Sequence, residues 1–347
     1  MSFDETKPVG FVTLGMFIID EFSFSDENGI PTGRTVDAQE WLVFTIYIGG
    51  GGTYAAIGAR IWLPAEAIGM VVDRGYDFPD SIRKQLLAYG SDMWMFRNQP
   101  GSKTTRALNS YVGEHRNFEY LTPRIRITPR DLIGTRIAKP KILHFICSPS
   151  RASAIMAEVG EIADWYPTTI YEPIPDRCVP EELPALIEVL PSISILSPNA
   201  EEALSLLSRA LPPTRASIEE AASCFLDYGI GDNGSGHVII RSGEMGAYVK
   251  SRERKGIWIE AYWKGEHEAR IVDVTGAGNS FLGGLAAGLL LSPDVFDATF
   301  YASVSASFTI EQQGLPTVSG AEAEHPLWNG DFPLRRLQIL KARHGEL

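Results

Sequence analysis

VDVTGAGNSFLGGLAAGLL, residues 272–290, is the stretch that decides the fold of this chain. A β-prone run leads into glycines that allow a tight turn, and the small apolar residues that follow predict a closely packed helix. Such a helix would turn its first free backbone N–H groups, near Ala277, Gly278 and Asn279, toward one space. The helix dipole adds positive potential there, so the segment predicts a binding site for an anion such as a phosphoryl group. A glycine-rich turn that only packs a helix on a strand is the structural alternative.

The segments around this stretch alternate between apolar, β-branched runs and helical patterns. We expect strands at 9–19, 67–73, 141–147, 168–173, 193–198 and 237–243. We expect helices at 53–63, 78–90, 151–165, 181–190, 199–210 and 217–228. This alternation predicts an α/β fold with a mostly parallel sheet, in which ligands bind beyond the carboxyl ends of the strands.

Two stretches interrupt the alternation with hairpin-like patterns, at about 17–48 and 104–122. Short β-prone runs separated by turn residues are typical of strands that lie outside a main core. We expect them to form a small β lid inserted in one domain that spans residues 1–347. No low-complexity linker divides the chain.

Charge and cysteine usage narrow the partners of the chain. It has 43 acidic and 31 basic residues, and the net charge of −12 opposes an interface that follows nucleic-acid phosphates. Cys147, Cys178 and Cys224 fit neither a zinc site nor a disulfide framework. No apolar run reaches the length of a membrane span, and the start does not resemble a signal peptide. We therefore expect a cytoplasmic protein that binds neither nucleic acid nor membrane.

The segment VDVTGAGNSFLGG resembles the second signature of the PfkB, or ribokinase-like, family of carbohydrate kinases, whose usual form is D-T-x-G-A-G-D-x-F-x-G-G. The resemblance implies a three-layer α/β/α fold with a small β lid, and an anion hole at Gly276, Ala277 and Gly278. Asn279 stands where the family has the Asp that removes a proton from the substrate hydroxyl. An amide accepts a hydrogen bond but cannot act as a base near neutral pH. The chain looks like the fungal maintenance-of-killer branch, in which the GGGN or GAGN form of the motif recurs.

The resemblance also implies residues that bind the acceptor. GMFIID, 15–20, ends in Asp20, which matches the family's carboxylate for substrate hydroxyls. GGGGTYAAIGAR, 49–60, is similar to the first family signature, and it places Gly50, Gly51 and Thr53 at the substrate. Thr53 replaces the usual Asn. Arg106, in the lid run TTRAL, is a candidate cation for an anionic ligand, with a solvated lid arginine as the alternative.

On the nucleotide side, SPNAEEA, 197–203, is similar to the family's N-x-x-E tetrad, whose relatives use it to organise waters around magnesium. Glu202 would thus act on the metal mainly through water, although an Asn cap with Glu in the first turn is also an ordinary helix start. IIRSGEMGAYV, 239–249, resembles a family turn that lies along the nucleotide, where Arg241 could reach a phosphate. The stretch 302–316 looks like the last core helix and the turn beside adenine. The implied nucleotide contacts are Asn199, Glu202, Arg241, Ser242, Gly243, Gly246, Gln313 and Gly314.

Three functions follow from this pattern. The first is ATP- and Mg-dependent phosphotransfer to a hydroxyl of a sugar-like or nucleoside-like molecule, slow if Asn279 leaves the site without a base. The second is a pseudokinase, a ligand-binding or scaffold protein that keeps the fold. The third is ATP-dependent chemistry on an acidic acceptor, which needs no base. A homodimer through the lid is a further expectation.

Overall fold

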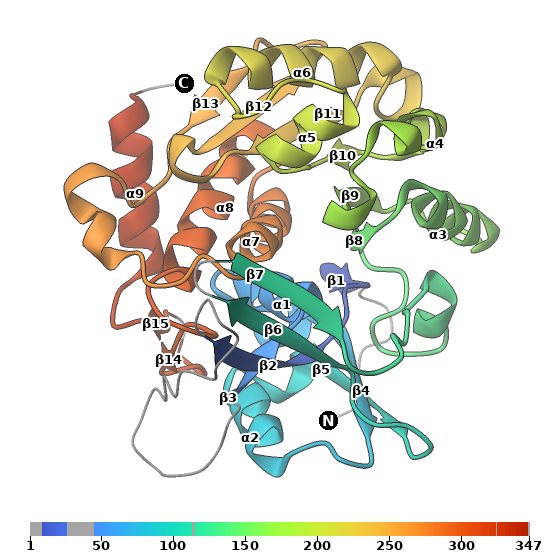
Figure 1. The fold of residues 1–347 in the computed structure, drawn as a ribbon, viewed down its shortest axis with the longest axis vertical. Helices are drawn as coiled ribbons and strands as arrows, with labels where there is room; N and C mark the ends of the chain where they lie inside the picture. The colour runs from blue at the N-terminus through green and yellow to red at the C-terminus, as the bar shows by residue number, and fades with distance from the viewer. Residues whose placement is uncertain (1–8, 26–44, 113–114, 324, 346–347) are drawn as a thin grey trace.

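The computed structural model describes residues 9–25, 45–112, 115–323 and 325–345, and Figure 1 shows their arrangement. In this part of the chain the main sheet has nine strands, in the order β13-β12-β11-β10-β9-β8-β1-β4-β5. All pairs are parallel except those of β12, which runs antiparallel to both neighbours. The strands are β1 (Phe11–Thr13), β4 (Ile68–Gly75), β5 (Trp94–Gln99), β8 (Ile142–Cys147), β9 (Thr168–Pro173), β10 (Ile195–Leu196), β11 (His237–Arg241), β12 (Ala247–Ser251) and β13 (Ile257–Ile259).

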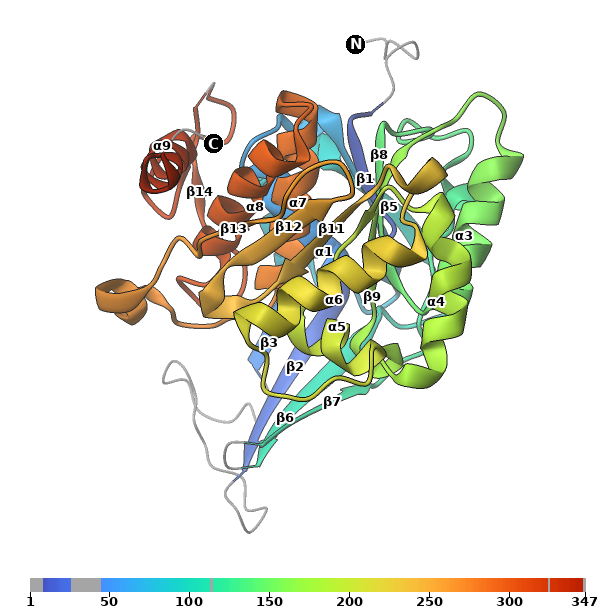
Figure 2. The same ribbon diagram turned by 90° about the horizontal axis from the view of Figure 1, so that it is seen from above.

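Helices cover both faces of this sheet, which gives the predicted three layers (Figure 2). One face packs against α1 (Gly51–Arg60), α2 (Asp80–Ala88), α7 (Ala277–Leu291) and α8 (Val295–Thr309). The other packs against α3 (Pro149–Glu161), α4 (Leu183–Val189), α5 (Ala200–Leu206) and α6 (Arg215–Tyr228). Side chains alternate between the faces along each strand, so in β8 Ile142 belongs to the first core and Leu143 to the second. The fold expected from the sequence is thereby confirmed.

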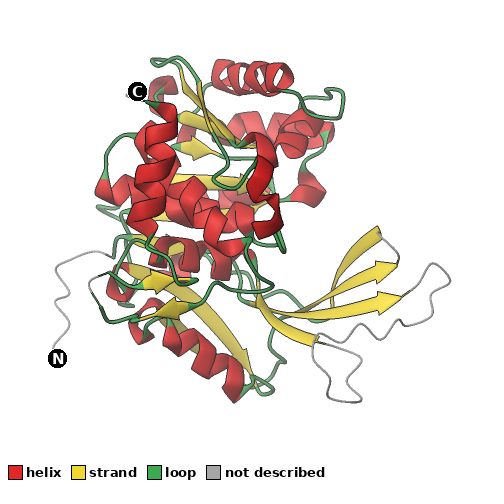
Figure 3. Ribbon diagram, turned by 90° about the vertical axis from the view of Figure 1, so that its left-hand side faces the viewer, coloured by secondary structure: helices red, strands yellow, loops and turns green. Residues whose placement is uncertain are grey.

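A second, four-stranded sheet projects from this body (Figure 3). Its order is β3-β2-β6-β7, with β2 (Ile18–Ser25), β3 (Thr45–Gly49), β6 (Arg106–Val112) and β7 (His115–Tyr120). These strands fall within the two hairpin-like stretches of the sequence. Residues 26–44, also assigned to the lid, lie outside the described residues. The role of this small sheet as a lid stays a prediction.

The first strand differs from the sequence expectation. One strand over residues 9–19 was wrong, because β1 ends at Thr13 and β2 begins at Ile18 in the other sheet. Between them Gly15 packs closely on α1, because a Cβ there would lie 2.6 Å from the backbone of Gly52. Asp20 therefore belongs to the small sheet and does not end a strand of the main one.

The C-terminal part also extends beyond the expectation. The helix expected from residue 302 begins at Val295, and it is followed by β14 (Val318–Ser319), β15 (Leu327–Trp328) and another helix, α9 (Pro333–His344). The Arg336 side chain of α9 is buried against the Phe308 ring, 3.7 Å from its centre, and pairs with Glu311 at 2.8 Å. Among the described residues, no helix combines the length and the hydrophobicity that a membrane span requires.

The helices α1 and α7 touch through their backbones. A Cβ on Gly58 of α1 would lie 2.1 Å from the carbonyl oxygen of Ser280 in α7. A Cβ on Gly283 of α7 would lie 1.8 Å from the carbonyl oxygen of Ala55 in α1. Only glycine permits so close an approach. The N-terminal ends of both helices carry predicted site residues, so this contact sets the distance between them.

Candidate active site

The helix α7 begins where the sequence predicted an anion site. Gly276 precedes the helix with φ of +76°, and a Cβ there would lie 2.3 Å from the Tyr54 ring, so both conformation and space require glycine. No side chain caps this helix. The N–H groups of Gly278 and Asn279 belong to the first turn, whose donors lack carbonyl partners within the helix. The Ala277 N–H, predicted to be free, instead donates to the Val274 carbonyl oxygen (3.1 Å).

The Arg241 side chain lies directly against this helix end. It is the last residue of β11, and its Nη1 is 2.2 Å from the place a Cβ on Gly278 would take. Nη1 forms an ion pair with Glu172 Oε1 at 2.9 Å, and Nη2 lies 3.6 Å from Glu202 Oε2. Nη2 also donates a hydrogen bond to the carbonyl oxygen of Ser197 (3.1 Å). The nearly buried guanidinium thus supplies a positive charge where the helix dipole is positive as well.

Glu172 joins this cation to Asn279, and sequence reasoning missed it. It lies near the end of β9 and is 6% exposed. Its Oε2 accepts a hydrogen bond from Asn279 Nδ2 (2.7 Å) and lies 3.6 Å from His144 Nε2. Burial favours the neutral acid, but Arg241, His144 and Asn279 together outweigh burial and lower the pKa of Glu172. The side chain is therefore an anion at neutral pH.

The carboxylate of Glu172 fixes the orientation of the side chains around it. A carboxylate only accepts hydrogen bonds, so the NH₂ of Asn279 faces Glu172 and its Oδ1 is left as an acceptor for another group. His144 is fully buried, and its Nδ1 is 3.0 Å from Thr13 Oγ1. With Nε2–H toward Glu172, the Thr13 hydroxyl donates to Nδ1. The only signal in the sequence was a polar residue inside each of two apolar runs, KILHFIC and TTIYEP.

Asn199 and Glu202 form a capping box at the start of α5. Asn199 Oδ1 accepts from the Glu202 N–H (2.8 Å), and Glu202 Oε2 accepts from the Asn199 N–H (2.7 Å). Burial raises the pKa of Glu202 to about 7, with the charge of Glu172 adding to the rise and that of Arg241 opposing it. Within the described residues no three acidic, His or Cys side chains gather as metal ligands. The donor set fits a magnesium ion held mainly by water and phosphate, with Glu202 acting through water.

The predicted acceptor residues flank a glycine turn beside Asn279. A Cβ on Gly49 would lie 1.8 Å from Asp20 Oδ2, and one on Gly51 would lie 3.0 Å from Asn279 Nδ2 and 2.5 Å from Ile146 Cδ1. The turn therefore brings Asp20 of the small sheet and Asn279 of α7 to neighbouring positions. Gly51, Ile146 and Asn279 are each half-buried, which leaves this side of the cluster accessible.

Three other predicted acceptor residues have structural contacts. Gly50 precedes α1 with φ of +91°, a conformation that favours glycine. Thr53 is buried, and its hydroxyl donates to the Gly49 carbonyl oxygen (2.8 Å). Arg106 forms ion pairs with Glu21 (2.9 Å) and Asp77 (3.0 Å), so an anionic ligand would have to compete with two carboxylates for it.

The predicted nucleotide turns lie on two different segments. The turn 242–246 follows β11 directly, and the Ser242 N–H donates to the Gly246 carbonyl oxygen (2.7 Å). Gln313 Oε1 accepts a hydrogen bond from the Tyr47 hydroxyl of β3 (3.1 Å), and Gly314 packs beside the same ring. The second turn is thus linked to the small sheet.

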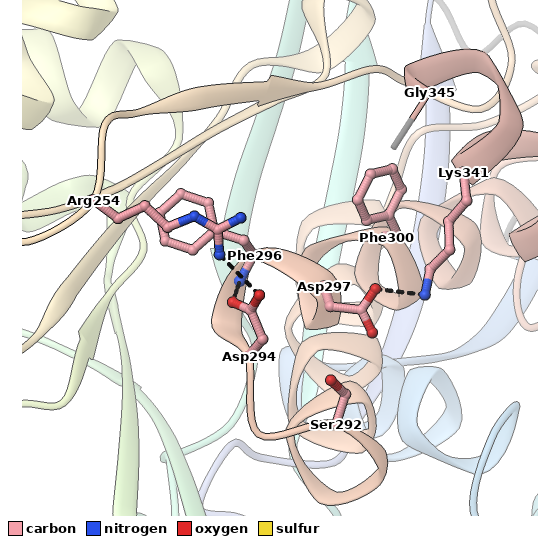
Figure 4. A pocket seen from close by; sticks show the side chains of 8 residues that line it. All are labelled: Arg254, Ser292, Asp294, Phe296, Asp297, Phe300, Lys341 and Gly345. Atoms are coloured by element: carbon pink, nitrogen blue, oxygen red, sulfur yellow. Dashed lines mark hydrogen bonds and ion pairs between the residues drawn. The ribbon is translucent and has the colours of Figure 1, made fainter. Parts of the chain in front are cut away.

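A separate cavity of about 370 Å³ lies at the opposite end of α7 (Figure 4). Its cations are already paired: Arg254 with Asp294 at 2.8 Å, and Lys341 with Asp297. None of the site residues predicted from the sequence lines it. The residues that the sequence predicts for the site therefore lie around the N-terminal end of α7, away from this cavity.

Comparison with known proteins finds relatives that cover nearly the whole chain. The chain is 31% identical to an uncharacterized protein of Schizosaccharomyces pombe over 96% of its length and 93% of the relative. It is 30% identical to Protein MAK32 of Saccharomyces cerevisiae, covering 98% of this chain and 94% of the relative. A ribokinase of Staphylococcus aureus is 26% identical, with 91% and 96% coverage.

Solved structures share the fold at lower sequence identity. Ribokinase from Giardia lamblia superposes with a TM-score of 0.70 at 17% identity, covering 98% of this chain and 100% of that one. Ribokinase of Arabidopsis thaliana, solved with ribose and ATP, gives 0.64 at 18%, covering 96% and 99%. The sequence profile described as pfkB family carbohydrate kinase matches residues 14–319. The chain therefore belongs to the pfkB family of carbohydrate kinases.

Proposed function

We propose that this chain is a small-molecule kinase that transfers the γ-phosphoryl group of ATP to a hydroxyl of a sugar-like or nucleoside-like acceptor. The observation that carries the proposal is the guanidinium of Arg241 fixed against Gly278 at the open end of α7. Phosphoryl transfer depends mainly on positioning and on stabilising charge, and a prepositioned cation at a helix N-terminus supplies both.

The arrangement of the site supports one placement of the substrates. Phosphates would lie at 276–278, with the nucleotide along 241–246 and toward 313–314. The acceptor would lie at the glycine turn 49–51, beside the amide of Asn279. The Asp20 carboxylate can accept hydrogen bonds from its hydroxyls. Magnesium held through water near Glu202 would neutralise charge on the nucleotide phosphates. Among the solved neighbours, a putative Ribokinase II from E. coli was crystallised with ATP and Mg.

One observation favours a pseudokinase as the second candidate. Arg241 is already paired with Glu172, and residue 279 is an amide that cannot remove a proton. A ligand-binding or scaffold protein would need neither a free cation nor a base. A third candidate, transfer to an acidic acceptor, would likewise bypass the base and would make the cation Arg106 more important than Asp20.

The deciding experiment combines a thermal-shift screen with a transfer assay. Nucleotides are screened with and without Mg²⁺, and radiolabelled γ-phosphate transfer is measured to sugars, polyols, nucleosides and organic acids. Transfer to a hydroxyl acceptor supports the kinase, and transfer to organic acids alone supports the third candidate. Nucleotide binding without any transfer supports the pseudokinase, and a chain that binds no nucleotide contradicts the proposed kinase.

A homodimer through the small sheet is also part of the proposal. The edge strands β3 and β7 could pair with a second copy of the chain, and analytical sedimentation tests for such a dimer.

A further inference from the structure

We propose that Glu172 is the base that takes the proton from the acceptor hydroxyl, with Asn279 holding its carboxylate beside the acceptor. This inference rests on the proposed kinase function. The carboxylate that is missing from position 279 is present one hydrogen bond away, because Glu172 Oε2 accepts from Asn279 Nδ2 at 2.7 Å. The site therefore has a carboxylate next to residue 279, but it is carried by β9 and not by α7.

The accessible side of the pair is the side of the acceptor. Oε2 lies beside Asn279, and Gly51 and Ile146 border the same amide group. These three residues are half-buried, whereas Glu172 itself is 6% exposed. We therefore place the acceptor hydroxyl on this side, beside the Asn279 amide that holds Oε2.

The two oxygens of Glu172 have different neighbours, which links the base to the phosphate site. Oε1 pairs with Arg241, whose guanidinium lies against Gly278 at the predicted phosphate position. A phosphoryl group bound there would share the cation with Glu172 and withdraw part of its counter-charge. A carboxylate with less counter-charge has a higher pKa and is a stronger base. Nucleotide binding would thus strengthen the base when it is needed.

Besides Arg241 and Asn279, His144 and Thr13 help to hold the Glu172 carboxylate in position. His144 Nε2 is buried 3.6 Å from Oε2, and within the described part of the chain it has no hydrogen-bond partner. His144 is held in turn by Thr13 at 3.0 Å. The carboxylate is therefore fixed from β8, β11 and α7, and this arrangement prepositions it for a single direction of attack.

In the proposed step the proton of the acceptor hydroxyl moves to Glu172 and the phosphoryl group moves to the acceptor oxygen. The acceptor O–H bond breaks and its proton moves to Glu172 Oε2, while the acceptor oxygen bonds to the γ-phosphorus of ATP. The bond from the γ-phosphorus to the bridging oxygen breaks, and ADP leaves with that electron pair. After the product departs, Glu172 releases its proton to water.

The test exchanges the carboxylate and the amide. Wild type, Glu172→Gln and the reciprocal double variant Glu172→Gln/Asn279→Asp are compared by kcat for transfer to a hydroxyl acceptor and by the Kd of ATP. We expect Glu172→Gln to lower kcat by roughly 10²- to 10⁴-fold, the usual contribution of a general base, while the Kd of ATP changes far less. The double variant returns a carboxylate to the pair and should recover at least about tenfold of the lost kcat.

The double variant also controls for folding, because it keeps one negative charge in the pair near Arg241. Glu219→Gln is a matched control, since Glu219 is a half-buried glutamate on α6 that accepts a hydrogen bond from Trp258 (2.7 Å) outside the site. A Glu172→Gln variant with wild-type kcat, or a double variant no faster than the single one, overturns this inference alone. Wild-type protein that binds ATP but transfers to no hydroxyl acceptor overturns the proposed function and the inference together.

Discussion

Replacing Glu202 with Gln should change how the stability of the protein depends on pH. In the folded chain burial raises the pKa of this carboxyl from 4.5 to about 7, and the positive charge of Arg241 only partly opposes the rise. A gap of about 2.5 pH units corresponds to about 3 kcal/mol of unfolding free energy, at about 1.4 kcal/mol per unit. Gln can still close the capping box with Asn199, so the substitution removes the ionisation and keeps the helix start.

The sign of the effect follows from proton binding. Between pH 4.5 and about 7 the folded chain keeps a proton on Glu202 that the unfolded chain has lost. The unfolding free energy of the wild type therefore falls as pH rises through this window. The pKa of Glu172 is lowered, so this side chain loses its contribution only as pH falls below 4.5, outside the window. In the Glu202→Gln variant, the part of this decline in unfolding free energy that Glu202 causes should be absent.

Urea unfolding at pH 5 and pH 8 measures the effect. The difference in unfolding free energy between Glu202→Gln and wild type should shift by up to about 3 kcal/mol in favour of the variant between the two pH values. Glu201→Gln is the matched control, because Glu201 is the exposed neighbour on the same helix and should leave the pH profile unchanged. Parallel profiles for wild type and Glu202→Gln would refute the reasoning.

Two other substitutions test the site and the C-terminal helix. A Cβ on Gly278 meets Arg241 Nη1 at 2.2 Å, so Gly278→Val should displace the cation and abolish the thermal stabilisation by nucleotide; unchanged stabilisation would contradict the phosphate placement. Gly160→Ala, where a Cβ meets nothing within 4 Å, is its control. Removing one partner of a buried ion pair costs roughly 3–5 kcal/mol, so Arg336→Met should destabilise the chain by about that amount in urea unfolding. The exposed neighbour substitution Arg335→Gln should leave the unfolding free energy close to that of the wild type, and equal effects of the two substitutions would count against this account.

The sequence predicted the elements whose signals are local. The glycines and small residues of 272–290 indicate a tight turn and a packed helix, and the structure places α7 there. The pattern at Asn199 and Glu202 is also typical of a helix start, and the structure shows a capping box there. Its role beside magnesium stays a prediction. The strand pattern failed at residues 9–19, because an apolar run does not show where the chain leaves one sheet for another.

The buried cluster could not be predicted in the same way. Glu172 and Asn279 are 107 positions apart, and they meet only because the sheet order places the end of β9 beside the start of α7. A single polar residue in an apolar run gives no indication of its partner. For the same reason the sequence offers Arg106 only as a candidate cation for an anionic ligand or as a solvated lid arginine, whereas the fold pairs it with Glu21 and Asp77. The sequence indicates only that residue 279 is not a base. Whether the site has a base depends on every group that the fold brings close to this residue.

The backbone contact between α1 and α7 has a consequence for how the protein can move. Where Gly58 and Gly283 allow two helices to touch, no side chain lies between them that could change rotamer and alter their separation. The glycine turn before α1 and the glycine turn before α7 should therefore keep a fixed separation. We expect any closure around bound substrates to come instead from the small sheet, through Tyr47, and from the side chain of Arg241. If the preference for an acceptor changes during evolution, we expect the substitutions to fall in those two parts, and we expect the contact between α1 and α7 to stay unchanged.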